Sequence, residues 1–203
     1  MDDLEIEVKF YCPNPQKTRN LILEAGALSE GRFFEKNTLY DRGDELFHRL
    51  SVLRLRQDKK ITLTYKEPVP GSDPAFKIVK ELEVEVNDFD RMEQILCSLG
   101  FQPVRKYEKW RETFTLGQTK LLLDGMPCGA FLELEGRRGP ITDLAARLGQ
   151  DWNDRIVLNY MQIYEILRKG EGIESRDFVF ETFEGLTINM EKYIDQFKAD
   201  KVE

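Results

Sequence analysis

The sequence predicts an α+β fold built on an antiparallel sheet or barrel, with helices on its outer side. Stretches in which apolar and charged residues alternate strictly outnumber the helical ones, which is typical of antiparallel strands. The same order of elements also occurs twice, each time as a strand, a helix and three further strands. The predicted elements are strands 4–10, 32–41, 51–57 and 60–67 with a helix at 15–26, then strands 80–87, 104–116, 119–124 and 130–136 with a helix at 88–100.

The two halves look like an internal duplication. Each predicted helix ends at a glycine, Gly26 or Gly100, and glycine favours the left-handed backbone that follows many helix C-termini. A loop at 67–75, rich in proline and glycine, joins the halves. The sequence therefore predicts a barrel built from two similar halves.

Beyond residue 136 the pattern turns helical. Thr142 and Asp143 are expected to cap a short helix at 143–149, and a second helix is expected at 154–169 with its apolar side chains on one side. The segment 170–203 carries an apolar stripe and no motif that indicates a site. We interpret it as a C-terminal extension used for packing or oligomerisation, which leaves a homodimer open.

Composition excludes several classes of protein. At 203 residues the chain is long enough to bury a proper core. A net charge of −7 argues against a nucleic-acid partner, because nucleic-acid-binding domains usually carry a basic excess. No run of 18 apolar residues and no basic leader occur, so we expect a cytoplasmic protein without a membrane partner. The three cysteines are interpreted as free thiols of a reducing compartment.

Absent motifs narrow the chemistry further. The single histidine, His48, leaves little for a histidine-based metal site or a Ser–His–Asp triad, and a lone histidine is usually structural or solvated. No P-loop and no dinucleotide glycine motif occur. Any phosphate recognition is therefore expected to rest on side chains.

Several strands carry like charges at alternate positions, which places those charges on one face. For a single strand, a solvated face is the usual explanation. The joint pattern favours one charged cavity, where like charges are expected to repel one another when no ligand is bound. Carboxylates suit Mg²⁺ and Mn²⁺, and arginine and lysine suit phosphate. The sets are Glu5/Glu7, Glu81/Glu83/Glu85, Glu133/Glu135, Arg54/Arg56 and Lys66.

With these motifs in order, the sequence resembles the CYTH superfamily, the triphosphate tunnel metalloenzymes, over roughly residues 3–168. The N-terminal motif is Glu5-x-Glu7-x-Lys9. The supporting motifs are Tyr40-Asp41, Leu53-Arg54-Leu55-Arg56, Thr64-Tyr65-Lys66, the acids Glu81 and Glu83, Lys109-Trp110-Arg111, Leu123-Asp124-Gly125, Gly129-x-Phe131-x-Glu133-x-Glu135, and Tyr160. The segment after 170 departs from the usual pattern, and the extra Glu85 leaves the register of the central acids open.

The resemblance implies an eight-stranded antiparallel barrel that forms a tunnel, with helices outside, over a domain at 1–169. It implies that the metal, Mg²⁺ or Mn²⁺, is held by Glu5, Glu7, Glu133 and Glu135. It implies that a triphosphate is bound by Lys9, Arg54, Arg56, Lys66, Lys109 and Arg111. The candidate catalytic residues are Glu81, Glu83, Asp124 and Tyr160.

The function expected from this set is metal-dependent hydrolysis of a triphosphate, such as tripolyphosphate, ATP or thiamine triphosphate. One alternative is a class IV adenylate cyclase, in which the 3′-hydroxyl of ATP attacks the α-phosphate and pyrophosphate leaves. Another is a non-catalytic module that binds nucleotide or polyphosphate, although the retained acids argue against it. No sequence feature fixes an adenine pocket, so the substrate, the reaction and the number of metal ions stay open.

Overall fold

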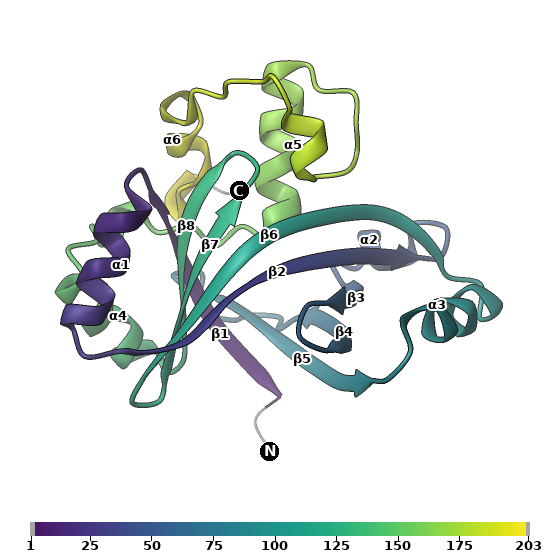
Figure 1. Cartoon of the computed structure of the whole chain (residues 1–203), viewed down its shortest axis with the longest axis horizontal. Helices are drawn as coiled ribbons and strands as arrows, with labels where there is room; N and C mark the ends of the chain where they lie inside the picture. Colours follow the sequence, from purple (N-terminus) through teal and green to yellow (C-terminus); the bar gives the residue numbers. More distant parts are fainter. Residues whose placement is uncertain (1–2, 202–203) are drawn as a thin grey trace.

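The computed structural model describes residues 3–201. Its centre is a closed barrel in which every neighbouring pair of strands is antiparallel (Figure 1). The order around the barrel is β1-β5-β4-β3-β2-β6-β7-β8. The strands are β1 Leu4–Cys12, β2 Leu28–Asp41, β3 Val52–Gln57, β4 Ile61–Pro68, β5 Lys77–Val86, β6 Gln102–Leu116, β7 Thr119–Met126 and β8 Gly129–Glu135. The α+β class and the eight-stranded antiparallel barrel are thus confirmed.

The two helices predicted between strands are present as α1 Pro15–Glu24 and α3 Phe89–Ser98. Both end as expected, because Gly26 and Gly100 follow them with φ of 86° and 89°, values that favour glycine. Asparagine and aspartate side chains cap their first turns by accepting backbone N–H groups. A short helix that the sequence did not predict, α2 Glu45–His48, fills the connection between β2 and β3.

The helix predicted at 143–149 begins earlier, as α4 Arg138–Arg147. Thr142 is not its cap: the Thr142 hydroxyl donates to the Arg138 carbonyl at 3.0 Å, inside the helix. Pro140 in the first turn is tolerated, because the first N–H groups of a helix have no intrahelical acceptor.

The helix predicted at 154–169 begins later, as α5 Tyr160–Glu171. Asn159 and Gln162 form a capping box, which fixes the start of the helix. Ahead of it, Ile156 exchanges two backbone hydrogen bonds with Lys9 of β1, at 2.8 and 2.9 Å. This extended pairing is incompatible with a helix through Ile156, so only the 3₁₀ helix Trp152–Asp154 precedes it.

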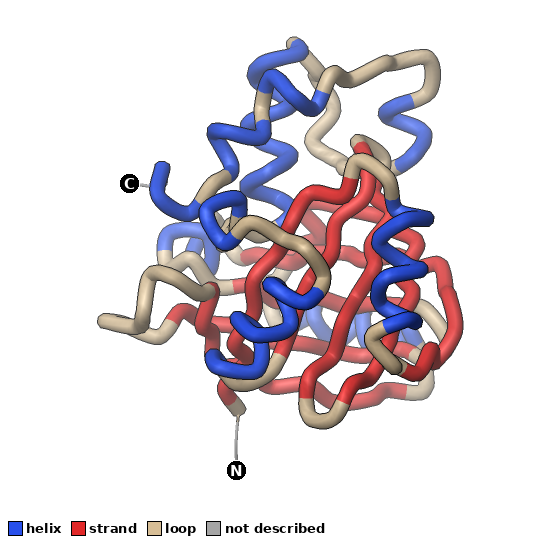
Figure 2. The backbone as a smooth tube through the Cα atoms, turned by 90° about the vertical axis from the view of Figure 1, so that its left-hand side faces the viewer, coloured by secondary structure: helices blue, strands red, loops and turns tan. Residues whose placement is uncertain are grey.

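The helices and the C-terminal segment lie outside the barrel and cover its apolar outer face (Figures 1 and 2). One core cluster joins β1, β7 and β8 to α1 and α4, and another joins α3 to β2 and β3. A third cluster joins one end of the barrel to α5 and to the segment after it. That segment contains η2 Phe180–Phe183, η3 Met190–Lys192, α6 Ile194–Phe197 and η4 Ala199–Lys201.

The segment after α5 packs closely on this end of the barrel. Phe178 stacks on Tyr164 of α5, with ring centroids 4.6 Å apart. Phe178 also makes an isolated bridge to Tyr107 of β6. The domain boundary at residue 169 stays a prediction. No helix among residues 3–201 has the length and apolar character needed to cross a membrane.

The strand order is compatible with two equivalent halves. Exchanging β1–β4 for β5–β8 leaves the list of neighbouring strands unchanged. The duplication itself stays a prediction.

Candidate functional site

The charged faces of the strands line the inside of the barrel. In β1, Val8 and Phe10 point outward into the core cluster beneath α1 and α4, so Glu7 and Lys9 point inward. Glu7, Lys9 and Lys109 are each only 2% exposed, and Asp124 is fully buried. Charged groups are rarely buried to this degree unless they are paired.

Four carboxylates gather on the β1–β8 wall. Antiparallel register places Glu7 opposite Glu135 and Lys9 opposite Glu133. Glu5, Glu7, Glu133 and Glu135 each offer an oxygen, and these oxygens all lie within 4.8 Å of one another. The Oε1 atom of Glu5 is buried without a hydrogen-bond donor. A cavity of about 220 Å³, lined by Asp3, Leu4, Glu5, Glu81 and Glu83, opens beside this cluster.

Crowding of these acids separates their pKa values. Burial and the neighbouring Glu7 charge raise the pKa of Glu5 to about 10. Burial and Glu133 raise the pKa of Glu135 to about 7. Burial alone would also raise the pKa of Glu7, but Lys77 and Lys9 hold it well below its usual range. Such a cluster fits a divalent cation, because its buried oxygens are the donor type that Mg²⁺ and Mn²⁺ prefer and one of them has no other partner.

Cations from β1, β4 and β5 lie beside these acids. Lys9 bridges Glu7 and Glu133, with 3.1 Å between Nζ and the Glu133 carboxylate. Lys77 lies 2.7 Å from Glu7. Lys66 of β4 contacts Glu5 and lies 3.3 Å from Glu81 of β5. The pKa of Glu81 falls to about 2, since burial is outweighed by its hydrogen bond with Glu5 and by the Lys66 charge.

A second group of cations occupies the β3–β4 side. Arg54 donates hydrogen bonds to the Tyr107 hydroxyl and to Thr64 Oγ1, both at 3.1 Å. It also lies 3.6 Å from Glu83, which Arg56 contacts at 3.3 Å. Burial alone would raise the pKa of Tyr107, but the Arg54 and Lys109 charges lower it.

Asp124 anchors a third group. It accepts hydrogen bonds from Lys109 at 2.9 Å, from Arg111 at 2.6 Å and from the Tyr160 hydroxyl at 2.8 Å. Burial would raise its pKa, but Arg111 and Lys109 hold the pKa of Asp124 below its usual range. Tyr160 comes from the first turn of α5, so the end of the barrel covered by α5 is tied to the interior at this carboxylate.

The structure thus brings the predicted site residues into one interior network. The expected repulsion among like charges holds for the acids, since, beyond burial, neighbouring carboxylate charges help to raise the pKa values of Glu5 and Glu135. Among the cations it is offset, because Arg54 and Arg56 share Glu83 and Lys9 bridges Glu7 and Glu133. Glu85 is separate from the network: its side chain is 63% exposed and pairs with Lys60 at the rim. The interior acids of β5 are therefore Glu81 and Glu83.

Two motif residues serve the scaffold. Tyr40 lies in the core cluster under α3 and donates to Glu93 at 2.7 Å. Asp41 accepts the backbone N–H groups of Leu46 and Phe47, which fixes α2. His48, on α2, stacks edge-on against Phe47 and takes no part in the interior network described here.

Sequence reasoning missed further interior residues. Glu35 is 2% exposed and lies 3.4 Å from Lys109 and 3.7 Å from Arg111. The alternation of side chains along β2 places Glu35 on the same face as Phe33 and Asn37, but Glu35 belongs to none of the sequence motifs. Lys77 was missed because the strand was predicted to begin at residue 80.

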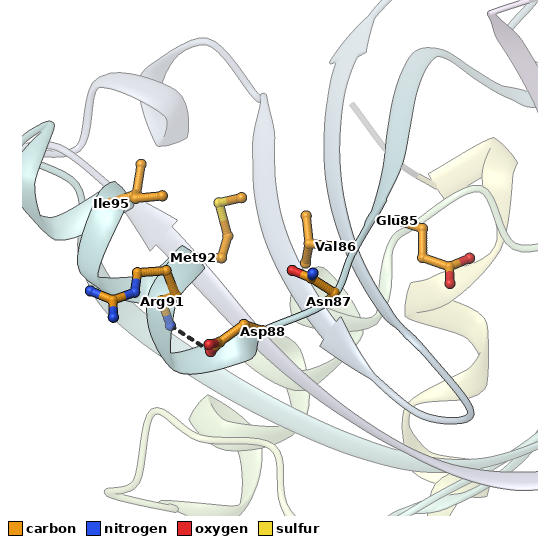
Figure 3. A pocket seen from close by; sticks show the side chains of 7 residues that line it. All are labelled: Glu85, Val86, Asn87, Asp88, Arg91, Met92 and Ile95. Atoms are coloured by element: carbon orange, nitrogen blue, oxygen red, sulfur yellow. Dashed lines mark hydrogen bonds between the residues drawn. The ribbon is translucent and has the colours of Figure 1, made fainter.

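A larger, open groove of about 540 Å³ lies between the end of β5 and α3 (Figure 3). Asp88 caps α3 there by accepting the Arg91 backbone N–H at 2.9 Å. None of the predicted metal or phosphate residues lines this groove; its lining residues are Glu85, Val86, Asn87, Asp88, Arg91, Met92 and Ile95.

Similarity to known proteins identifies the family of this chain. The model of the CYTH domain matches residues 3–155. The chain belongs to the CYTH domain family. The match ends ahead of α5 and the segment that follows it.

Individual proteins resemble this chain over most of their length. A Methanocaldococcus jannaschii protein, provisionally named an adenylate cyclase, is 26% identical over 167 residues, or 81% of this chain and 89% of the relative. The solved structure of a Pyrococcus horikoshii OT3 protein, also 26% identical, gives a TM-score of 0.68 and covers 78% of this chain and 98% of its own.

A third protein shares the fold of this chain at lower identity. It is a Hippeastrum protein, provisionally named an adenylyl cyclase and described as having a dominant triphosphatase activity. Its structure gives a TM-score of 0.55 at 16% identity and covers 82% of this chain and 96% of its own. At that identity the likeness concerns the fold alone.

Proposed function

We propose that this protein hydrolyses a triphosphate in a reaction that depends on Mg²⁺ or Mn²⁺. The observation that carries the proposal is the set of four carboxylates within 4.8 Å inside a closed barrel whose other walls carry lysine and arginine. Membership of the CYTH family supports it. The partner is a small-molecule triphosphate.

Glu5, Glu7, Glu133 and Glu135 would hold the metal. When bound there, the ion supplies Lewis acidity toward phosphoryl oxygens and lowers the pKa of coordinated water. The unpartnered oxygen of Glu5 supports this assignment, because a buried acceptor without a donor is unfavourable until a cation reaches it.

The cations would bind the phosphate chain. Arg54 and Arg56 share Glu83 as an acceptor, and phosphate oxygens replace that carboxylate when a triphosphate enters. Lys9, Lys66, Lys109 and Arg111 supply the remaining positive charge, which stabilises the charge developing on the leaving phosphate. The acids Glu81 and Glu83 are then free to bind a second ion or to orient the attacking water.

Asp124 and Tyr160 act differently in this proposal. Asp124 stays ionised because Arg111 and Lys109 lower its pKa, so it does not donate a proton. Asp124 holds Lys109 and Arg111 toward the phosphate chain, and the Tyr160 hydroxyl donates a hydrogen bond that holds Asp124 in place. Both are positioning residues.

A second candidate is the cyclase reaction, which the name of the Methanocaldococcus jannaschii relative favours. In it, the ribose 3′-oxygen of ATP bonds to the α-phosphorus, the bond from that phosphorus to the bridging oxygen breaks, the hydroxyl proton is released, and pyrophosphate leaves. Hydrolysis instead transfers a phosphoryl group to water. The same cations serve either reaction, and which phosphorus faces the nucleophile decides between them.

Product analysis tests the proposal. The protein is incubated with tripolyphosphate, ATP or thiamine triphosphate, each with Mg²⁺, Mn²⁺ or excess EDTA. We expect phosphate plus the diphosphate product, with turnover abolished by EDTA. Formation of cyclic AMP and pyrophosphate from ATP would instead identify the protein as a cyclase. Metal-dependent binding without turnover would make the protein a binding module, and full turnover in EDTA would overturn the metal assignment.

A further inference from the structure

We infer that Phe33, whose ring Lys59 covers in the free protein, forms a subsite at one mouth of the barrel for the aromatic heterocycle of an organic triphosphate. The inference rests on the proposed function and deepens it, because it selects organic triphosphates over tripolyphosphate. Three observations carry it: the position of the Phe33 ring, the groups that contact this ring, and the register that places Phe33 beside Arg111, one of the proposed phosphate-binding cations.

Phe33 lies on the inner wall of the barrel. Register places it opposite Arg111 of β6, which is opposite Asp124 of β7, and both of those side chains belong to the interior network. Glu35, the next inward residue of β2, is 2% exposed, whereas Phe33 is 36% exposed. The inner wall therefore passes from buried to open between these two residues.

The strand register also places Phe33 at a rim. β3 pairs with β2 from Lys36 onward, so Phe33 lies beyond the last β2–β3 pair. This rim is at the end of the barrel where β1 starts. Lys36 pairs with Gln57, Gln57 with Ile61, and Ile61 with Val86, and Val86 is the end of β5 that extends past the pairing of Lys80 with Leu4. The cavity beside Glu5 and Glu81 opens at this end.

Other inward aromatic rings belong to the opposite end. Tyr107, Phe131 and Tyr160 are members of the core cluster built with α5, and Tyr11 packs against it. Phe33 belongs to none of the three apolar clusters of the described residues. A large aromatic side chain that is half-open and outside every core cluster has no evident packing role.

The backbone holds the Phe33 ring in place. Gly31 lies at a bulge of β2 with φ of +103°, and a Cβ there would be 2.8 Å from the nearest ring carbon. Glycine thus allows the ring edge to rest on the strand. The ring is positioned before any ligand arrives.

One face of that ring already contacts a cation. Lys59, in the turn between β3 and β4, places Nζ 3.4 Å from the ring centroid and donates to the Glu30 carbonyl at 3.2 Å. Cation–π contacts at exposed sites are weak, and a lysine side chain is long and flexible. A planar heterocycle can therefore displace the ammonium and stack on the ring.

The geometry sets what such a ligand must be. Phe33 is the cross-strand neighbour of Arg111, so a group esterified to the phosphate that binds at Arg111 would lie within reach of the ring. Stacking tolerates any planar heterocycle, so adenine and the rings of thiamine share this chemistry. Tripolyphosphate has no group that reaches the ring.

Calorimetry on the full chain with Mg²⁺ tests the inference. The probes are β,γ-methylene-ATP, thiamine triphosphate and tripolyphosphate. In Phe33→Leu we expect affinity for one or both organic probes to fall at least about fivefold, the lower end of base–aromatic stacking, with tripolyphosphate affinity unchanged. Which organic probe responds identifies the heterocycle. Lys59→Ala is expected to keep organic-probe binding, because it uncovers the ring.

Phe34→Leu is the matched control. Phe34 is the next residue of β2 but points outward, where it packs against Trp110 with ring centroids 5.0 Å apart, so neither class of probe should respond. If Phe33→Leu weakens all probes equally, or none, while the wild type binds tripolyphosphate, the subsite is wrong. If the wild type binds no probe in the presence of Mg²⁺, the proposed function itself fails.

Discussion

At the scale of single residues, the interior is neutralised by its own pairs. Sequence patterns predicted which residues line the cavity, because alternation assigns a face to every strand residue. They could not predict that Lys66 of β4 would reach Glu5 of β1, since the two strands are separated by β5. Partner choice depends on how the strands pair around the barrel, so alternation alone could not show that the expected repulsion persists among the acids but is offset by ion pairs among the cations.

The first prediction separates two glutamates of the acid cluster. Glu5→Gln should abolish Mn²⁺ binding with little loss of stability. One Glu5 oxygen has no hydrogen-bond donor, and Lys66 retains its ion pair with Glu81 when the Glu5 charge is removed. Glu7→Gln should also abolish binding but lower the free energy of unfolding by about 3–5 kcal/mol, since Lys9 and Lys77 lose a buried partner. Urea denaturation and Mn²⁺ calorimetry check this; equal stabilities would contradict it.

The second prediction concerns Arg54. Arg54→Ala should weaken tripolyphosphate binding by about 1–3 kcal/mol, the range for charge-assisted hydrogen bonds. It should also destabilise the free protein, because the Tyr107 hydroxyl and Thr64 lose a buried partner. Arg168→Ala, which removes a pair with Glu165 outside the barrel, is the control for binding. Unchanged tripolyphosphate affinity in Arg54→Ala would move the phosphate site elsewhere.

The third prediction is a pH dependence of metal binding. The pKa of Glu135 is about 7 in the metal-free protein, and a carboxyl must lose its proton to become a ligand. Raising the pH from 6 to 8 should therefore tighten Mn²⁺ binding and reduce the protons released per ion. Glu135→Gln should flatten this dependence around pH 7. Calorimetry in two buffers of different ionisation enthalpy measures the protons released, and affinity that weakens with rising pH would refute the prediction.

At the scale of elements, the strands and the first two helices could be predicted because alternation and terminal glycines are local signals. The start of α5 could not: periodicity alone extends to residue 154, whereas the bridge between Ile156 and Lys9 is a contact across the fold. Thr142 misled for a similar reason, because a threonine signals a cap from sequence but its hydroxyl bonds back to Arg138 inside the helix.

The fourth prediction concerns the segment after α5. Phe178 is fully buried and lies against Tyr164 and Phe183, so Phe178→Ala should lower the free energy of unfolding by about 3–5 kcal/mol. Phe47→Ala, at a ring that is 64% exposed, should change it little. Urea titrations of both variants decide the matter; a small effect at Phe178 would mean that the segment does not stabilise the barrel end.

At the scale of the whole molecule, closure of the sheet was the step that strand patterns left open. Alternation is satisfied equally by an open antiparallel sheet, and the β1–β5, β2–β6 and β1–β8 pairings between non-consecutive strands are what turn eight strands into a ring. These pairings join residues more than seventy positions apart in some cases, such as Lys36 with Glu108. The ordered CYTH motifs implied the ring, because a resemblance along the whole chain carries information about strand pairing that local alternation does not.

The last prediction follows from the ring enclosing one site. A ligand that binds only the folded state stabilises it by mass action, by about 2.7 kcal/mol at a hundredfold excess over its Kd. For a chain of this size that corresponds to a rise in Tm of about 5–10 °C. We expect this rise with tripolyphosphate and Mg²⁺, and a much smaller one with single phosphate, which spans only part of the cationic wall. Glu5→Gln should lose the response to tripolyphosphate with Mg²⁺ while keeping its own Tm. Equal shifts with phosphate and tripolyphosphate would show that the cavity does not distinguish the length of the phosphate chain.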